Sequence, residues 1–163
     1  MKLALKSLRL LQVAALLAAA LIAKPVLAAE SVPFHAVYDL QFSAQINPPL
    51  ASVTATGTGL ATQLGRMTAT SISEVVDLST GEGLARYRYT GANGDSFEVE
   101  IDFTLVPTPT GFTSSGTWHV TSGTGRFAGA SGGGTLAGRI DFTGATVGVA
   151  RITLDGVLTP PGI

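Results

Sequence analysis

The chain has 163 residues, with ten basic side chains, eleven acidic ones, two histidines and no cysteine. The lack of cysteine excludes disulfides, thiol catalysis and a lipoprotein anchor. Residues 29–163 hold six arginines, no lysine and all eleven acidic groups. An acidic, lysine-free segment is a poor candidate for binding nucleic acid or anionic lipid.

The first 28 residues have the pattern of a signal peptide. Three basic residues within the first nine precede an apolar run over residues 10–23, and Val26-Leu27-Ala28 supplies the small residues of a cleavage site. We expect cleavage after Ala28, or after Ala29, and export to the periplasm or the extracellular space. Residues 29–163 would then form a single domain without a stable membrane anchor. A retained anchor is the alternative, but the apolar run is short for a membrane span.

After the signal peptide, apolar and polar residues alternate between clusters of turn-forming residues, which indicates β-strands. Strands are predicted at residues 34–42, 52–65, 66–77, 84–90, 96–105, 112–120, 136–142 and 150–158. Ser43–Leu50 is predicted to be a loop, and Asn93-Gly94 suits a type I′ hairpin turn because both residues tolerate positive φ. Gly57 and Gly59 indicate a sharp bend within their strand. Pro107 and Pro109 are expected to end the strand that begins at Ser96.

Eight strands with one apolar face each predict an all-β, closed antiparallel barrel, because closure removes exposed sheet edges. A β-sandwich is the competing architecture, and a barrel with a polar lumen and a lipid-facing apolar wall is a third. The inward set is nearly all apolar, with Tyr38, Tyr87, Tyr89 and Trp118 as candidate lumen-lining residues. An interior without titratable groups argues against acid–base catalysis. An eight-stranded barrel is either just filled by its side chains or holds one small ligand, and the many small inward residues leave the second option open.

The polar patterns are interpreted as structural. Glu98, Glu100 and Asp102 are spaced about 7 Å apart along one strand face, near the separation of a glycosidase pair. The opposite face is fully apolar and must be the buried one, so the acidic face is expected to be solvated. His35 and His119 fall on polar strand faces and are too few for a zinc site.

Two further patterns resemble nucleotide-binding or nucleic-acid-binding motifs, but both are interpreted as structural. The glycines of residues 123–128 match a dinucleotide-binding loop only superficially, because Gly132-Gly133-Gly134 would prevent the helix that such a loop requires. Residues 86–89 interleave arginine and tyrosine, as single-strand binders do. Because successive residues of a strand point to opposite faces, the arginines are expected on the outer face. There they would pair with Glu98, Glu100 or Asp102 of the neighbouring strand. We therefore predict no catalytic residue, no metal site and no cofactor.

At residues 123–130, Gly-Thr-Gly-Arg-Phe-Ala-Gly-Ala, the chain resembles the allene oxide cyclase/dirigent-like β-barrel superfamily, and in particular its secreted bacterial members. Residues 61–66 and 92–95 add to the likeness. The resemblance implies a closed eight-stranded barrel that is often oligomeric, with trimers among the plant relatives. It carries over no activity, because none of the polar cavity residues of plant cyclases or dirigent proteins aligns with this chain. The shared stretch is interpreted as structural, through residues Gly123, Gly125, Arg126, Phe127 and Gly129.

Within that stretch the glycines would allow a tight crossing, Phe127 would plug a barrel end, and Arg126 would cap carbonyl groups. The sequence thus predicts an exported, non-catalytic barrel that binds a small hydrophobic ligand or serves as a structural module. The alternative is an isomerase, cyclase or dirigent-like protein acting on a hydrophobic substrate in the lumen. A polar residue pointing into a real cavity would favour that alternative, and a packed lumen would exclude it.

Overall fold

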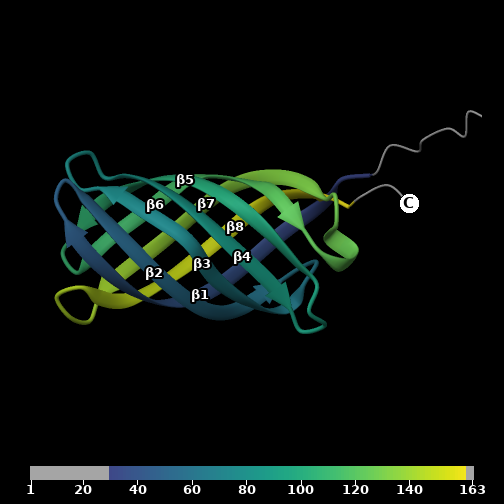
Figure 1. Cartoon of the computed structure of the whole chain (residues 1–163), viewed down its shortest axis with the longest axis horizontal. Coiled ribbons are helices and arrows are strands. Elements are labelled where there is room, and N and C mark those ends of the chain that lie inside the picture. Colours follow the sequence, from purple (N-terminus) through teal and green to yellow (C-terminus); the bar gives the residue numbers. More distant parts are fainter. Residues whose placement is uncertain (1–29, 161–163) are drawn as a thin grey trace, which may run out of the picture.

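The computed structural model describes residues 30–160, which form a closed barrel of eight antiparallel strands (Figure 1). Each strand pairs with the next in sequence, and the last pairs with the first. The strands are β1 (Val32–Asn47), β2 (Leu50–Ala61), β3 (Gly65–Asp77), β4 (Glu82–Gly91), β5 (Ser96–Thr108), β6 (Gly111–Gly123), β7 (Ser131–Phe142) and β8 (Val147–Thr159). A one-turn 3₁₀ helix, η1 (Gly125–Phe127), lies between β6 and β7. The predicted all-β, eight-stranded antiparallel barrel is confirmed.

The predicted signal peptide, residues 1–28, lies outside the described residues. Within residues 30–160, no helix has the length and apolar character needed to cross a membrane.

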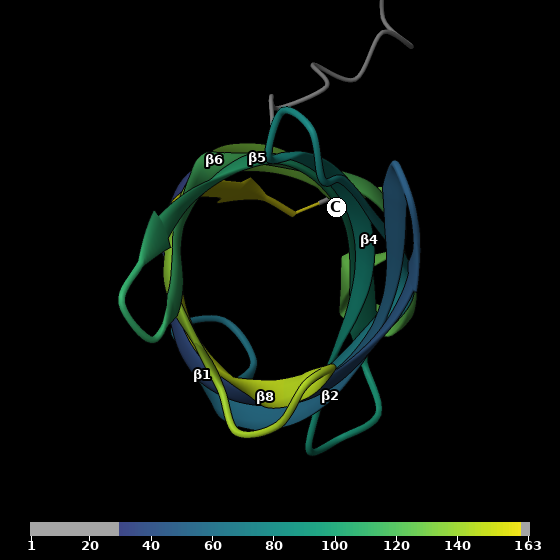
Figure 2. The same ribbon diagram turned by 90° about the vertical axis from the view of Figure 1, so that its left-hand side faces the viewer.

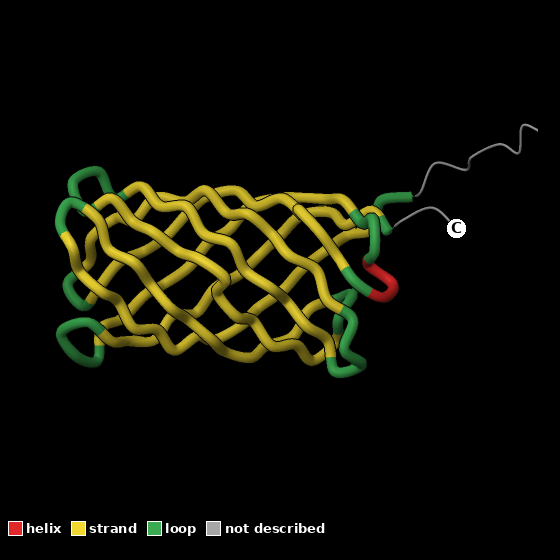
Figure 3. The backbone as a smooth tube through the Cα atoms, in the orientation of Figure 1, coloured by secondary structure: helices red, strands yellow, loops and turns green. Residues whose placement is uncertain are grey.

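The two ends of the barrel differ. One end, here called the hairpin end, carries the short turns that join β1 to β2, β3 to β4, β5 to β6 and β7 to β8; it faces the viewer in Figure 2. The other, the terminal end, carries the start of β1, the end of β8 and η1, and lies at the right of Figures 1 and 3. The strands run obliquely between the two ends (Figure 3).

The apolar side chains point into the barrel. On β1, Phe34, Ala36, Tyr38 and Leu40 are buried, while the residues between them are exposed or only partly buried. The same alternation holds on β5 from Phe97 to Ile101. The core therefore lies inside the barrel, and the lipid-facing arrangement considered above is not adopted.

Aromatic side chains fill the terminal half of the lumen. Phe97 contacts Phe34 and Phe127 edge to face, with ring centroids 5.6 and 5.3 Å apart. Phe34 also packs on Trp118, with centroids 5.3 Å apart. Phe127, which η1 carries, is only 3% exposed. Since burying one such side chain stabilises a fold by about 1.5–3 kcal/mol, this packed half is a principal source of stability.

A β-bulge in β3 changes which residues face inward. Thr56 pairs with Thr70, whereas Ser52 pairs with Val75, so β3 contains one residue more than β2 over this span. The pairing with β4 shifts between Ser71 and Ser73 in the same way. Alternation continued from the start of β3 would point Glu74 outward. The extra residue reverses the alternation, and Glu74 faces the lumen.

Several element boundaries differ from the sequence prediction. Ser43–Leu50 is not a loop, because β1 continues to Asn47 and β2 starts at Leu50, with inward apolar positions extending to Ile46. The turn at Asn93-Gly94 is not type I′, because only Gly94 has positive φ (88°). The Gly94 amide donates a hydrogen bond to the Gly91 carbonyl. Pro107 does not end its strand but pairs with Phe112 inside β5.

Candidate functional site

The hairpin half of the lumen contains a cavity of about 130 Å³ that all eight strands line. Alanines at positions 44, 51, 55, 85 and 150 leave this space, because they fill less of the lumen than the aromatic residues of the terminal half. Ile46, Leu78 and Phe142 also line it and are 51%, 47% and 41% exposed, so the cavity opens toward the hairpin end. Its other end is closed by the packed aromatic half.

A carboxyl–phenol pair supplies the main polar group of this apolar cavity. The Tyr87 hydroxyl donates a 2.6 Å hydrogen bond to Oε2 of Glu74. Burial raises the pKa of Glu74 above its usual value, and the hydrogen bond from Tyr87 offsets part of that increase. Burial and the neighbouring carboxylate together raise the pKa of Tyr87 well above its usual range. Tyr87 is therefore a neutral donor, and Glu74 is the group that titrates.

Two more tyrosines continue this polar layer into the packed half. The hydroxyls of Tyr38 and Tyr89 lie 2.8 Å apart and hydrogen-bond to each other. Both side chains are buried, and burial raises the pKa of each phenol, so both stay neutral. The Tyr87 and Tyr89 rings stack with centroids 6.3 Å apart. Tyr38 and Tyr87 line the cavity, whereas Tyr89 lies outside the cavity lining.

Ser114 on β6 is a second polar residue of the cavity wall. It is 7% exposed, and its hydroxyl has no hydrogen-bond partner among the described residues. Gly138 lies opposite it on β7, where a side chain would collide with the Ser114 hydroxyl. A buried, unpaired hydroxyl is unfavourable, so Ser114 is a position where a ligand or water could supply the missing partner.

Of the four candidate lumen-lining residues, Tyr38 and Tyr87 line the cavity. Tyr89 and Trp118 are buried at 0% and 2% exposure but do not line it. The Trp118 indole donates a 3.3 Å hydrogen bond to the Asp155 carbonyl. These two residues therefore belong to the packed half.

The glycine-rich motif lies at the terminal end. Phe127 closes the packed half there, and the Arg126 guanidinium donates a 2.6 Å hydrogen bond to the Gln63 carbonyl. Arg126 also pairs with Asp95 at 3.4 Å. Gly125 adopts φ +58°, which favours glycine, beside the Asp95 side chain. Gly123 is the last residue of β6 and Gly129 lies in the connection to β7, and no residue of the motif lines the cavity.

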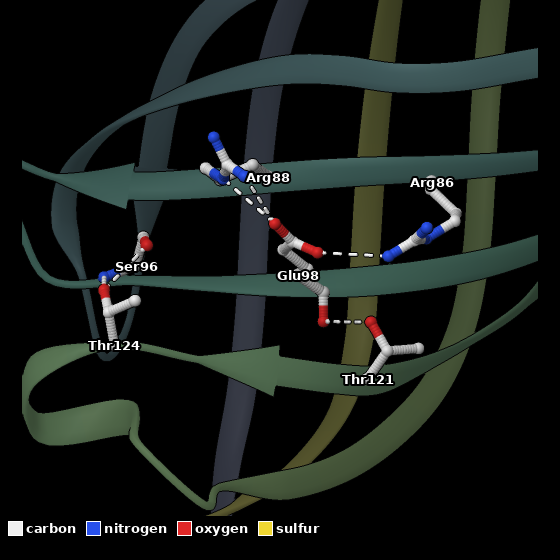
Figure 4. Close-up of polar contacts among 6 residues, drawn as sticks. All are labelled: Arg86, Arg88, Ser96, Glu98, Thr121 and Thr124. Atoms are coloured by element: carbon white, nitrogen blue, oxygen red, sulfur yellow. Dashed lines mark hydrogen bonds and ion pairs between the residues drawn. The ribbon is translucent and has the colours of Figure 1, made fainter.

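The acidic residues of β5 lie on the outer wall. Glu98 accepts hydrogen bonds from Arg86 (3.2 Å) and Arg88 (2.6 Å), as alternating strand faces predict (Figure 4). The Arg88 hydrogen bond lowers the pKa of Glu98. The Glu98 backbone carbonyl also accepts from the Thr121 hydroxyl, and Ser96 bonds Thr124 beside it. This network joins β4, β5 and the end of β6.

The two histidines pair with separate carboxylates on the outer surface. His35 lies 2.6 Å from Asp155, and His119 lies 3.9 Å from Glu100. Within residues 30–160, no three histidine, cysteine or acidic side chains gather in a way that could hold a metal ion.

Sequence reasoning missed Glu74 and Ser114. The expectation of an interior without titratable groups is wrong, because the bulge in β3 brings Glu74 into the lumen. A signal for the bulge does exist in the sequence: apolar Met67 and Ala69 occupy odd positions, whereas Val76 and Leu78 occupy even ones. The exposed Val75 obscures this change of phase.

No family model matches the chain, and no curated protein matches it. Among solved structures, the pterocarpan synthase dirigent protein GePTS1 is similar to this chain with a TM-score of 0.47 and 9% sequence identity. The match covers 84% of this chain and 92% of that one. No ligand or activity is carried over from it.

Proposed function

We propose that the barrel binds one small, mainly apolar molecule in the hairpin half of its lumen. The observation that carries this proposal is an apolar cavity of about 130 Å³ with one carboxyl–phenol pair, Glu74 and Tyr87, in its wall. Binding pockets typically combine apolar walls with a few polar groups that fix the orientation of the ligand. The proposed ligand therefore has an apolar body and one hydrogen-bonding group.

The size of the cavity limits the ligand. An apolar cavity of about 150 Å³ accepts benzene, and this cavity, at about 130 Å³ and open at one end, is of similar size, so a body of about one ring is the upper limit. Removing that body from water favours binding by about 25 cal/mol per Å² of apolar surface. The mouth at the hairpin end would admit a substituent that extends beyond the cavity.

Native mass spectrometry of the purified chain tests the proposal. We expect a retained mass in the wild-type protein and its loss in Ala55→Leu, because Ala55 is 7% exposed and lines the cavity. Thr54→Leu places the same side chain on the outer wall of the same strand and should retain the mass. Thermal unfolding of both variants checks that Ala55→Leu remains folded, since overfilling a core costs about 1–3 kcal/mol. An identical bound mass in Ala55→Leu would contradict lumen binding.

A second candidate function, isomerisation of a hydrophobic substrate, is favoured by one observation. Burial raises the pKa of the Glu74 carboxyl within an apolar cavity, and a carboxyl group so placed can accept and return a proton. The molecule recovered from the barrel, incubated with fresh protein, tests this candidate by liquid chromatography. Conversion by the wild type but not by Glu74→Gln would support catalysis. If the wild type and Glu74→Gln both return the molecule unchanged, the barrel binds it without converting it.

We further propose that the protein acts after export, in the periplasm or outside the cell. The signal-peptide pattern of residues 1–28 supports this location. A homo-oligomer, with three subunits as the family resemblance implies, is also proposed. The native mass spectrum that detects a ligand also gives the subunit number.

A further inference from the structure

The geometry of the lumen points to a cationic ligand: we infer that the cavity selects small hydrophobic amines, whose ammonium group pairs with Glu74. This inference rests on the proposed function and specifies the chemical class of the ligand.

The first argument is the charge balance inside the cavity. Among the described residues that line it, Glu74 is the only acidic side chain, and there is no lysine, arginine or histidine. An ionised carboxylate in an apolar site is unfavourable unless a partner compensates its charge. Tyr87 supplies a neutral donor and leaves that charge uncompensated. A ligand cation would complete the pair.

The second argument is the unused hydrogen-bonding capacity of Glu74. Tyr87 binds Oε2, and within the described part of the chain Oε1 has no hydrogen-bond partner. An ammonium group has three donors and no acceptor, and its hydrogen bonds to carboxylate are among the stronger ones in proteins. It can therefore bond to Oε1 while the Tyr87 contact remains.

The third argument is the aromatic composition of the wall. Tyr87 contacts the carboxylate, and Tyr38, Phe42, Phe103 and Phe112 line the same cavity. Aromatic faces attract an ammonium group, and more strongly when it is removed from water. The apolar body of the same ligand would occupy the space left by Ala55 and Ala85.

The fourth argument is the charge near the mouth. Asp77 and Glu82 flank the turn between β3 and β4 at the hairpin end. Asp141, at the end of β7, is paired with Arg139 at 2.8 Å. The mouth thus carries an excess of negative charge, which raises the local concentration of cations and repels carboxylates.

Three ring-sized probes of different charge test the inference: benzylamine, benzyl alcohol and benzoate. Their affinities are measured at pH 7.5 by NMR titration of the wild type, Glu74→Gln and Glu100→Gln. Glu100 lies on the outer wall near His119, so its variant is a matched control for the loss of one negative charge. Glutamine at position 74 keeps an acceptor for Tyr87 but removes the charge.

We expect benzylamine to bind the wild type and Glu100→Gln at least tenfold more tightly than benzyl alcohol. Glu74→Gln should weaken benzylamine binding at least tenfold and change benzyl alcohol binding by less than threefold. Benzoate should bind most weakly. The comparison of the three probes on wild-type protein remains decisive if Glu74→Gln does not fold.

Two results separate failure of this inference from failure of the proposed function. Binding of benzyl alcohol or benzoate as tightly as benzylamine would overturn the amine assignment and leave lumen binding intact. Failure of all three probes to bind at about 10 mM, which means dissociation constants weaker than the millimolar range, would overturn both.

Discussion

Tyr87→Phe gives the sharpest test of the lumen site, because it removes one hydroxyl and leaves the ring in place. That hydroxyl donates a 2.6 Å hydrogen bond to Glu74. Hydrogen bonds to charged groups contribute about 1.5–3 kcal/mol to stability, and bonds between neutral groups about 0.5–1.5 kcal/mol. The free-energy cost of the substitution should therefore depend on whether Glu74 is ionised.

The direction of the pH dependence follows from the raised pKa of Glu74. In the wild type, the free energy of unfolding falls as the pH rises from the ordinary glutamate pKa through the raised one, because the folded state disfavours ionisation. Loss of the Tyr87 donor raises the folded-state pKa of Glu74 further, so the decline becomes steeper. At pH 4 the carboxyl is mostly protonated in both states, so the substitution costs least there.

Water can enter the cavity from the hairpin end and partly replace the lost donor. The lower end therefore applies both to the range for hydrogen bonds to charged groups and to the range for bonds between neutral groups. We expect a loss of about 1.5 kcal/mol at pH 8 and about 0.5 kcal/mol at pH 4. For a domain of this size, 1 kcal/mol shifts the melting temperature by about 4 °C. The melting temperature should thus fall by about 6 °C at pH 8 and about 2 °C at pH 4.

Thermal unfolding followed by circular dichroism at pH 4, 6 and 8 measures these shifts. Tyr89→Phe is the matched control, because it breaks a 2.8 Å hydrogen bond between two phenols that burial keeps neutral. Its cost should be the same at all three pH values. Equal costs of Tyr87→Phe at pH 4 and pH 8, or the same pH dependence in Tyr89→Phe, would refute the assignment of Glu74 as the titrating group.

Three other predictions concern separate parts of the chain. Phe127→Ala should cost about 3 kcal/mol in urea unfolding, since it removes a buried ring from the terminal end; benzylamine affinity should be unchanged, and a loss of binding would show that the two halves are coupled. Ser114→Ala should leave stability unchanged or raise it by up to about 1 kcal/mol, because it removes a buried, unpaired hydroxyl; a loss above 1 kcal/mol would mean that the hydroxyl has a partner in solution. Intact-mass measurement of the exported protein should show a chain that begins at Ala29; a chain that still contains Met1 would contradict the signal-peptide prediction.

The fold was predictable where the alternation is strict. From Phe97 to Phe103, apolar residues occupy every second position of β5, and that face of the strand lies toward the lumen. Strict alternation was therefore sufficient to predict both the strand and its buried face. The same alternation predicted that Arg86 and Arg88 pair with the acidic face of β5, but it did not select Glu98 among the three carboxylates. Closure into a barrel followed from the number of strands and the need to avoid exposed edges.

The candidate site was only half predictable. Tyr38 and Tyr87 could be placed in the lumen by alternation, but the position of Glu74 depends on a single extra residue in β3. Ile72, the unpaired residue of that bulge, and Val75 beyond it are both exposed, so hydrophobicity does not mark the change of face. The contact between Tyr38 and Tyr89 depends on strand register across 51 positions, which local pattern does not determine.

The barrel and its cavity are complete only when β8 pairs with β1. This seam joins Val32 to Leu158 and continues along both strands to Ser43 and Val147, so it closes a loop of more than a hundred residues. Contacts between such distant residues form slowly, which is typical of all-β folds. A nascent chain that has not yet released β8 has two unpaired strand edges and an incomplete cavity wall. Protection from edge-to-edge association and the ability to hold a ligand therefore arise in the same late event, when the last strand meets the first.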